Sequence, residues 1–227
     1  MNVASPEELA ELAVPSRSAV IVIDPQHDFC SEKGALAQRF GFDMADIQKT
    51  VPQLNDFIET ARSRGVPVVW VREVFADSKM RASHKSLWGS GNDIWLIRED
   101  SKGIDWYEGM VPPRPDEPVV TKWQYDAFED TDLQLLLESR GISTVLMTGF
   151  TTNVCVETSA RHAYIKGYQV LLVTDCCNST TPAEHDAAVF NIGTYFGRLT
   201  TSGDLANAWN SADATWAVAE PSTAIIG

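Results

Sequence analysis

Three residues of the sequence combine an acid, a cation and a nucleophile at comparable positions. Asp24, Lys122 and Cys155 each close or follow a short run rich in β-branched and apolar residues. A thiolate attacks carbonyl carbons, a carboxylate carries protons, and an ammonium group stabilises nearby negative charge. Each residue alone has an ordinary explanation: a turn aspartate, a solvated strand end, or an inert buried cysteine. Together, at one edge of one sheet, they indicate a nucleophilic active site.

Cys155 lies where a helix is expected to begin. The buried-strand run TVLMTG precedes it, and SARHAYIKGY follows it with a helical pattern. The positive end of a helix, together with a nearby Lys122, lowers the pKa of a thiol and favours its thiolate. We therefore expect Cys155 to be a reactive nucleophile; a small core residue is the alternative.

Six short apolar runs predict the strands that would position these residues. They are SAVIVI (18–23), VPVVWV (66–71), PVVTK (118–122), TVLMTG (144–149), QVLLVT (169–174) and RLTTS (198–202). Strands that are apolar on both faces are typical of a parallel sheet covered by helices. The sequence therefore predicts an α/β fold of three layers (α/β/α) with a doubly wound, mainly parallel six-stranded sheet. Ligands of such sheets bind outside the carboxyl ends of the strands, where the three residues fall.

Helical patterns lie between these runs. Apolar residues recur at helical spacing over 47–61, where Pro52 is expected to kink or restart the helix. The sequence TPAE at 181–184 is a capping box with proline at the first helical position. Strand and helix therefore alternate along the chain.

No linker or repeat divides the sequence, so residues 1–227 are expected to form one domain with its core at about 18–205. The segment 73–117 is long and polar, and a connection of that length is usually a lid or a specificity segment. Its tryptophans would form a lid, a satellite core or a subunit interface; they are Trp88, Trp95 and Trp106. The tail 210–227 shows no helix-length pattern and is expected to dock on a neighbouring subunit.

Composition narrows the class of protein. The chain is 44% hydrophobic and 22% charged, as in a globular protein, and its net charge of −13 disfavours nucleic acid and anionic membranes as partners. No apolar run approaches the ~18–20 residues that a membrane span needs. The acidic start MNVASPEELAEL lacks the features of a signal peptide, and four cysteines make a poor disulfide framework, so a reducing, cytoplasmic setting is expected.

Three motifs resemble a known family. IDPQHDF, TKWQYDAF and GFTTNVCVETSARHAYIKGY are similar, in order and spacing, to the signatures of the isochorismatase-like cysteine hydrolases over about residues 18–200. Within the family, the ureidoacrylate and biuret amidohydrolases look closest, because Lys122, Tyr125 and Phe128 match their pattern. The run AAVFNIGTYFG resembles the ureidoacrylate group in particular.

The resemblance implies a mechanism. Asp24, Lys122 and Cys155 would form the catalytic triad, and a cis peptide would join Phe150 to Thr151. The backbone N–H groups of Thr151 and Cys155 would then form an oxyanion hole. The implied enzyme is an amidohydrolase that cleaves a C–N bond of a small ureido, carbamoyl or amide substrate and releases ammonia through a thioester-like intermediate. No metal and no cofactor are expected.

Four residues are candidates for substrate binding. Gln26 and Glu73 would accept hydrogen bonds from substrate N–H groups, and Tyr125 would donate one to a ureido or carboxylate oxygen. Phe29 would form an apolar wall, although a core position is nearly as good an explanation for it.

Charged residues near the long segment have weaker functional interpretations. Arg72 or Lys85 would pair with a substrate carboxylate if there is one, and solvated charges are the alternative. Asp77 and His84 would make a poor metal site, because the segment lacks the Asp-x-His element of the nicotinamidase-type members.

Two rival functions remain. One is a different hydrolase of the same family, acting on a plain carboxamide or an N-carbamoyl amino acid. The other is a non-enzymatic α/β module that binds a small molecule, which is disfavoured because neither GxGxxG nor a P-loop follows any expected strand. The resemblance also implies a homo-oligomer, a dimer or a tetramer.

Overall fold

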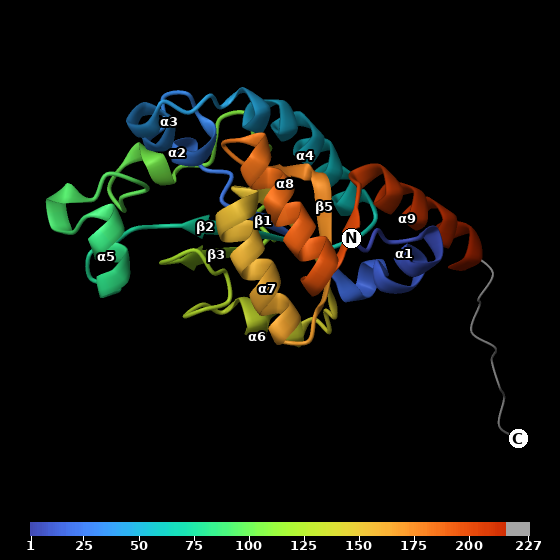
Figure 1. Cartoon of the computed structure of the whole chain (residues 1–227). Helices are drawn as coiled ribbons and strands as arrows, with labels where there is room; N and C mark the ends of the chain where they lie inside the picture. The colour runs from blue at the N-terminus through green and yellow to red at the C-terminus, as the bar shows by residue number, and fades with distance from the viewer. Residues whose placement is uncertain (217–227) are drawn as a thin grey trace, which may run out of the picture.

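The computed structural model describes residues 1–216, with side chains described through residue 211. Its centre is a six-stranded sheet, parallel throughout, in the order β3-β2-β1-β4-β5-β6 (Figure 1). The strands are β1 (Ser18–Ile23), β2 (Val68–Glu73), β3 (Val119–Lys122), β4 (Thr144–Phe150), β5 (Gln169–Asn178) and β6 (Arg198–Thr200). The predicted six-stranded parallel sheet is confirmed.

Helices cover both faces of the sheet (Figure 1). One face carries α1 (Pro6–Leu12), α3 (Ala35–Phe40), α4 (Ala45–Ser63) and α9 (Ser202–Trp216), with α2 (His27–Cys30) beside them. The other face carries α6 (Leu133–Ser139), α7 (Glu157–Ile165) and α8 (Pro182–Asn191). A short helix, α5 (Ala82–Trp88), projects from the carboxyl end of the sheet. The three-layer prediction is therefore confirmed.

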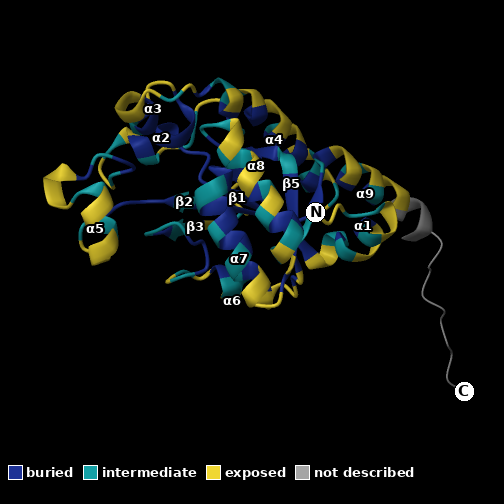
Figure 2. Cartoon of the chain, viewed as in Figure 1, coloured by how far each residue is buried: buried dark blue, intermediate teal, exposed yellow. Residues whose placement is uncertain are grey.

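Alternation along β1 shows how the sheet divides the core. Val20 and Val22 belong to the apolar cluster under α4, whereas Ala19, Ile21 and Ile23 belong to the cluster under α7. All five side chains are fully buried, and Figure 2 shows the sheet as the buried centre of the molecule. Strands that are buried on both faces explain the unbroken apolar run in the sequence.

Two helices test the local predictions. The α4 helix runs continuously over Ala45–Ser63 with Pro52 inside it, so the predicted restart is wrong. Burial of its apolar face against the sheet offsets the ~3 kcal/mol that a proline costs inside a helix. The capping box of α8 is confirmed: the Thr181 hydroxyl accepts from the Glu184 N–H, and the Glu184 carboxylate accepts from the Thr181 N–H.

The long segment 73–117 is folded onto the domain. It contains α5 and the short 3-10 turns Gly91–Asp93 and Lys102–Ile104, and a β-bridge joins Phe75 to Arg98. Its three tryptophans pack against the apolar cluster under α4; they are Trp88, Trp95 and Trp106. A satellite of the core is therefore their structural role, and Trp88 also reaches the pocket described below.

The C-terminal prediction was wrong in part. Residues 210–216 continue the α9 helix, whose Trp209 is buried against Phe57. Residues 217–227 lie outside the described residues, so docking of that part of the tail on a subunit stays a prediction. None of the helices within residues 1–216 has the length and apolar character to cross a bilayer.

Candidate active site

Four ionisable side chains meet at the carboxyl edge of the sheet. Glu73 and Lys122 are the last residues of β2 and β3, Asp24 follows β1 directly, and Cys155 follows β4 after a tight connection. These four strands are neighbours in the sheet, so their ends converge. All four side chains are buried, with at most 3% of each residue exposed. The structure therefore brings the three residues singled out from the sequence together and adds Glu73 to them.

Lys122 is the centre of this cluster. Its Nζ lies 2.8 Å from Asp24 Oδ2 and 3.1 Å from Glu73 Oε2. The same Nζ lies 3.4 Å from Cys155 Sγ, and the thiol lies 3.5 Å from Glu73 Oε2. One ammonium thus bridges two carboxylates and the sulfur. With the thiol neutral and both carboxylates ionised, the cluster carries one net negative charge.

The backbone conformation positions the Asp24 carboxylate and the Cys155 thiol. Asp24 adopts a left-handed conformation (φ 52°), which aspartate tolerates better than most residues. Cys155 lies in a π-helical turn, Thr152–Val156, that leads directly into α7, so it occupies the first turn of the helical segment. The peptide between Phe150 and Thr151 is cis.

Burial shifts the proton affinities of the cluster. It raises the pKa of Asp24 to about 7, a shift that Lys122 opposes and Glu73 reinforces. Burial would lower the pKa of Lys122, but the charges of Asp24, Cys155 and Glu73 outweigh it and raise that pKa. Burial also raises the pKa of the Cys155 thiol well above its ordinary value, although Lys122 acts to lower it. The expected lowering of the thiol pKa is therefore wrong for the resting site, and Cys155 needs an adjacent base.

The cluster also has the composition of a metal site. Within residues 1–216, ligand atoms of Asp24, Glu73 and Cys155 lie within 4.8 Å of one another. The Lys122 ammonium, however, lies within 3.4 Å of an atom of each of the three. A metal ion would have to displace this cation, so metal independence stays our prediction.

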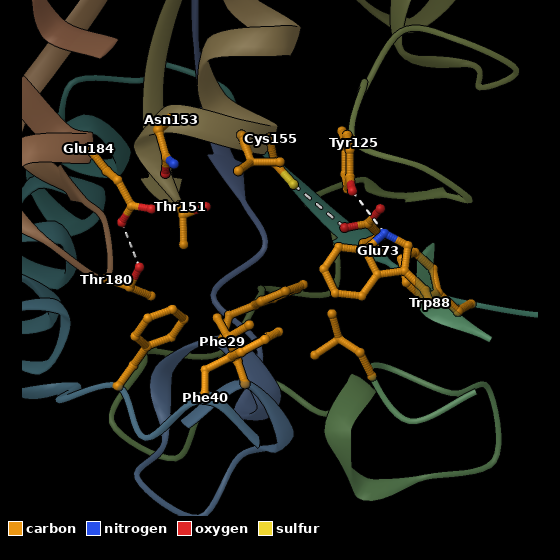
Figure 3. A pocket seen from close by; sticks show the side chains of 15 residues that line it. Phe29, Phe40, Glu73, Trp88, Tyr125, Thr151, Asn153, Cys155, Thr180 and Glu184 are labelled. Atoms are coloured by element: carbon orange, nitrogen blue, oxygen red, sulfur yellow. Dashed lines mark hydrogen bonds between the residues drawn. The ribbon is translucent and has the colours of Figure 1, made fainter. Parts of the chain in front are cut away.

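A pocket of about 200 Å³ opens onto Cys155 and Glu73 (Figure 3). Its polar lining comes from the ends of β2 and β4 and the start of α8; these residues are Glu73, Thr151, Asn153, Thr180 and Glu184. Its apolar lining comes mostly from residues 29–42 and the 73–117 segment; these residues are Phe29, Leu36, Phe40, Phe42, Phe75, Trp88, Leu96 and Val154. Tyr125 completes it.

Three of the four predicted substrate-binding residues line this pocket: Phe29, Glu73 and Tyr125. Gln26 does not. Its Oε1 accepts from the Glu73 N–H at 2.7 Å, and its Nε2 donates to the Glu73 carbonyl at 2.9 Å. A side chain engaged on both sides of the Glu73 backbone holds the end of β2 in place, and this replaces the substrate contact expected of Gln26.

The charged candidates from the sequence are engaged outside the pocket. Asp77 forms an ion pair with Lys85, whose Nζ lies 3.1 Å from its Oδ1, and Arg72 Nε donates to the Thr121 hydroxyl at 3.0 Å. The His84 ring packs edge to face against the rings of Phe75 and Tyr125. Neither Arg72 nor Lys85 lines the pocket, so neither meets the role of a carboxylate partner there.

Sequence reasoning missed two features of the site. It placed Glu73 in the pocket but not in contact with Lys122, although Glu73 and Lys122 are register partners across β2 and β3. It also missed the aromatic wall from Phe40, Phe42 and Phe75. An acidic residue ending a strand beside the strand of Lys122 is a usable signal for the first feature, whereas the wall has no periodic pattern.

Comparisons with known proteins agree with this geometry. Residues 18–204 match the Isochorismatase domain family. The chain is 31% identical over 213 residues to the ureidoacrylate amidohydrolase RutB of Enterobacter sp. (strain 638), which covers 86% of this chain and 90% of that protein. It is 30% identical over 204 residues to the RutB of Caulobacter vibrioides, covering 84% and 90%.

A solved structure of a cysteine hydrolase has a similar fold. The crystal structure of a cysteine hydrolase from Pseudomonas syringae pv. phaseolicola 1448A matches with a TM-score of 0.78 at 26% identity, covering 93% of this chain and 98% of that one. The fold and these relatives thus define a hydrolase with a three-layer α/β/α architecture. The chain belongs to the isochorismatase family, which confirms the resemblance drawn from the three motifs.

Proposed function

We propose that the protein hydrolyses a C–N bond of a small amide or ureide through a covalent intermediate on Cys155. The observation that carries this proposal is the buried contact of the Cys155 thiol with Lys122 and Glu73 at the floor of a mostly apolar pocket. The amidohydrolase relatives support the same class of reaction.

Asp24 is the proton carrier in this proposal. A group with a pKa of about 7 is suited both to accept a proton and to return it at neutral pH. Its carboxylate lies within 4.8 Å of the Cys155 sulfur. Transfer of the thiol proton to Asp24 leaves a thiolate beside the Lys122 ammonium, which stabilises it.

Acylation follows from this proton transfer. The thiolate forms a bond to the substrate carbonyl carbon, and the carbonyl oxygen becomes an oxyanion. Backbone N–H groups of Thr151 and Cys155, at the start of the helical segment, are assigned to bind it, and loss of one such donor costs about 3 kcal/mol. The C–N bond then breaks as Asp24 returns its proton to the nitrogen, which leaves as ammonia.

Hydrolysis of the acyl-enzyme repeats the sequence with water. Asp24 removes a proton from the water, whose oxygen bonds to the carbonyl carbon. The C–S bond breaks, the Asp24 proton returns to the sulfur, and the acid product leaves. No step requires a metal or a cofactor.

Two side chains are assigned to bind the reacting amide. Glu73 Oε1 is buried and has no hydrogen-bond partner among the described residues, so it is available to accept from a substrate N–H. The Tyr125 hydroxyl accepts from Trp88 Nε1 at 2.8 Å and keeps its own hydrogen to donate to a substrate oxygen.

An ammonia-release screen tests this function. Ureides and plain carboxamides are incubated with the wild-type protein, Cys155→Ala and Cys177→Ala. Cys177 is a matched control, since it is equally buried at the end of β5 and lies in the same apolar cluster as Cys155. We expect ammonia from the wild type and Cys177→Ala only; turnover by folded Cys155→Ala would refute the proposal.

A further inference from the structure

The pocket beyond the reacting cluster is mostly apolar. Nine of its lining side chains are hydrophobic or aromatic, and Phe29 and Phe40 face its open centre (Figure 3). Phe40 and Trp95 pack edge to face outside it, which holds the wall together. A surface of this kind favours an apolar substrate group, at about 25 cal/mol per Å² of apolar area that it buries.

The charges that line the pocket all have one sign. Its charged residues are Glu73 and Glu184, which lie on opposite sides of it in Figure 3. The Glu184 carboxylate accepts from the Thr180 and Thr181 hydroxyls, at 2.7 and 2.9 Å, so it is fixed in place. Among the described residues, the pocket lining includes no arginine or lysine to pair with a substrate carboxylate.

Four cationic side chains of the described residues that could serve the pocket already have partners. Lys122 is shared by Asp24 and Glu73, and the Arg39 guanidinium lies 4.4 Å from the centre of the Trp95 ring. Arg72 and Lys85 are bound to Thr121 and Asp77, as described above. A carboxylate in this pocket would be desolvated between two glutamates without a positive partner, which is strongly unfavourable.

We infer that the substrate is an uncharged amide or ureide whose substituent is alkyl or aryl, rather than a ureido acid. This inference rests on the proposed function. The amide end lies against Cys155 and Glu73, and the substituent extends toward the wall of Phe29, Phe40 and Phe42. The relatives are named for ureidoacrylate, which carries a carboxylate. We therefore do not expect ureidoacrylate to be the substrate of this protein.

An isosteric pair of substrates tests the inference. The pair is 3-ureidopropionate and 3-methylbutylurea, in which an isopropyl group of similar size replaces the carboxylate. We expect kcat/KM to be at least about 100-fold higher for the neutral urea, because the anion loses its solvation without gaining a partner. Equal values, or a preference for the anion, would overturn the inference.

A binding measurement separates this result from the proposed function. Each compound is used to protect Cys155 against iodoacetamide, followed by mass spectrometry, which needs no turnover. Absence of ammonia from every compound would refute the proposed function. The inference would still hold if the neutral urea protected Cys155 at a concentration at least tenfold lower than the anion, and fail if it did not.

A charge placed in the wall gives a second test. Phe40 is 52% exposed, so arginine is accommodated there, and Phe190 on α8, 51% exposed and outside the pocket, is a matched control. Phe40→Arg should raise kcat/KM for 3-ureidopropionate at least about tenfold and lower it for 3-methylbutylurea. Phe190→Arg should leave the ratio of the two kcat/KM values unchanged. An unchanged ratio in Phe40→Arg would contradict the inference.

Discussion

The two halves of the pocket are built differently. The floor is a compact ionic cluster in which one lysine holds two carboxylates and a thiol within 3.4 Å. The wall is a set of apolar side chains from residues 29–42 and 75–96, held by aromatic contacts such as that of Trp88 with Trp95. Strand ends fix the floor, whereas helices and loops that meet only in the fold form the wall. We expect the floor to control the chemical step and the wall to control which substrate binds.

Asp24→Asn should have the largest effect on the floor after loss of the nucleophile. Without the proton carrier, kcat should fall by about 10²–10⁴-fold, the usual range for a general acid–base. Alkylation of Cys155 by iodoacetamide should persist, because loss of the Asp24 charge removes one cause of the raised thiol pKa and Lys122 still stabilises the thiolate. Steady-state kinetics measure the fall in kcat, and labelling rates measure the alkylation. If the variant kept more than about a tenth of wild-type kcat, Asp24 would not be the proton carrier.

Glu73→Gln should have the next largest effect. Loss of a buried, charged hydrogen-bond acceptor should lower kcat/KM by roughly 10–100-fold. Glu73 also raises the pKa of Asp24, so its removal should move the ascending limb of the pH profile, near pH 7 in the wild type, to lower pH.

The matched control for this change is Glu184→Gln. It lines the other side of the pocket, and glutamine also serves in a capping box, so α8 should keep its start. The pH profile of Glu184→Gln should keep its position. If the ascending limb of the Glu73→Gln pH profile stayed in place or moved to higher pH, Glu73 would not raise the pKa of Asp24.

A change in the wall should alter binding more than chemistry. Phe29→Leu removes apolar area from the pocket, and KM for an apolar urea should rise roughly tenfold with kcat nearly unchanged. Phe57→Leu is the control, because Phe57 is buried against Trp209 away from the pocket and should lower only thermal stability. A fall in kcat for Phe29→Leu, with KM constant, would break the division between floor and wall.

Chelation should have the smallest effect. The Lys122 ammonium already lies among the three potential ligands, so prolonged treatment with a chelator should leave kcat/KM unchanged. Activity measured before and after dialysis checks this. A loss that zinc or manganese restores would show that a metal displaces Lys122.

The floor was more predictable from the sequence than the wall. Asp24 and Cys155 follow strands with clear apolar runs and Lys122 ends one, and parallel strands bring their carboxyl ends together. The ion pair between Glu73 and Lys122 depends on the register of β2 with β3, which cannot be predicted from the sequence alone. The raised pKa of Cys155 was also missed, because helix position was considered and the depth of burial was not.

The wall could not be predicted because its residues share no periodic pattern. Phe40 and Phe42 flank the end of α3, whereas Trp88 and Leu96 belong to the long segment. Contacts between such segments arise from the tertiary fold. For the same reason, the sequence assigned Gln26 to the substrate although it binds the Glu73 backbone.

The proposed mechanism depends most on the covalent step at Cys155, and rapid-quench mass spectrometry measures this step directly. Wild-type protein is mixed with 3-methylbutylurea, quenched in acid within the first turnovers, and digested. We predict that the peptide containing Cys155 gains the mass of the substrate less ammonia, and that this adduct decays as the product accumulates. Turnover without any adduct on that peptide, or an adduct on the peptide of Cys30 or Cys177 instead, would contradict the account.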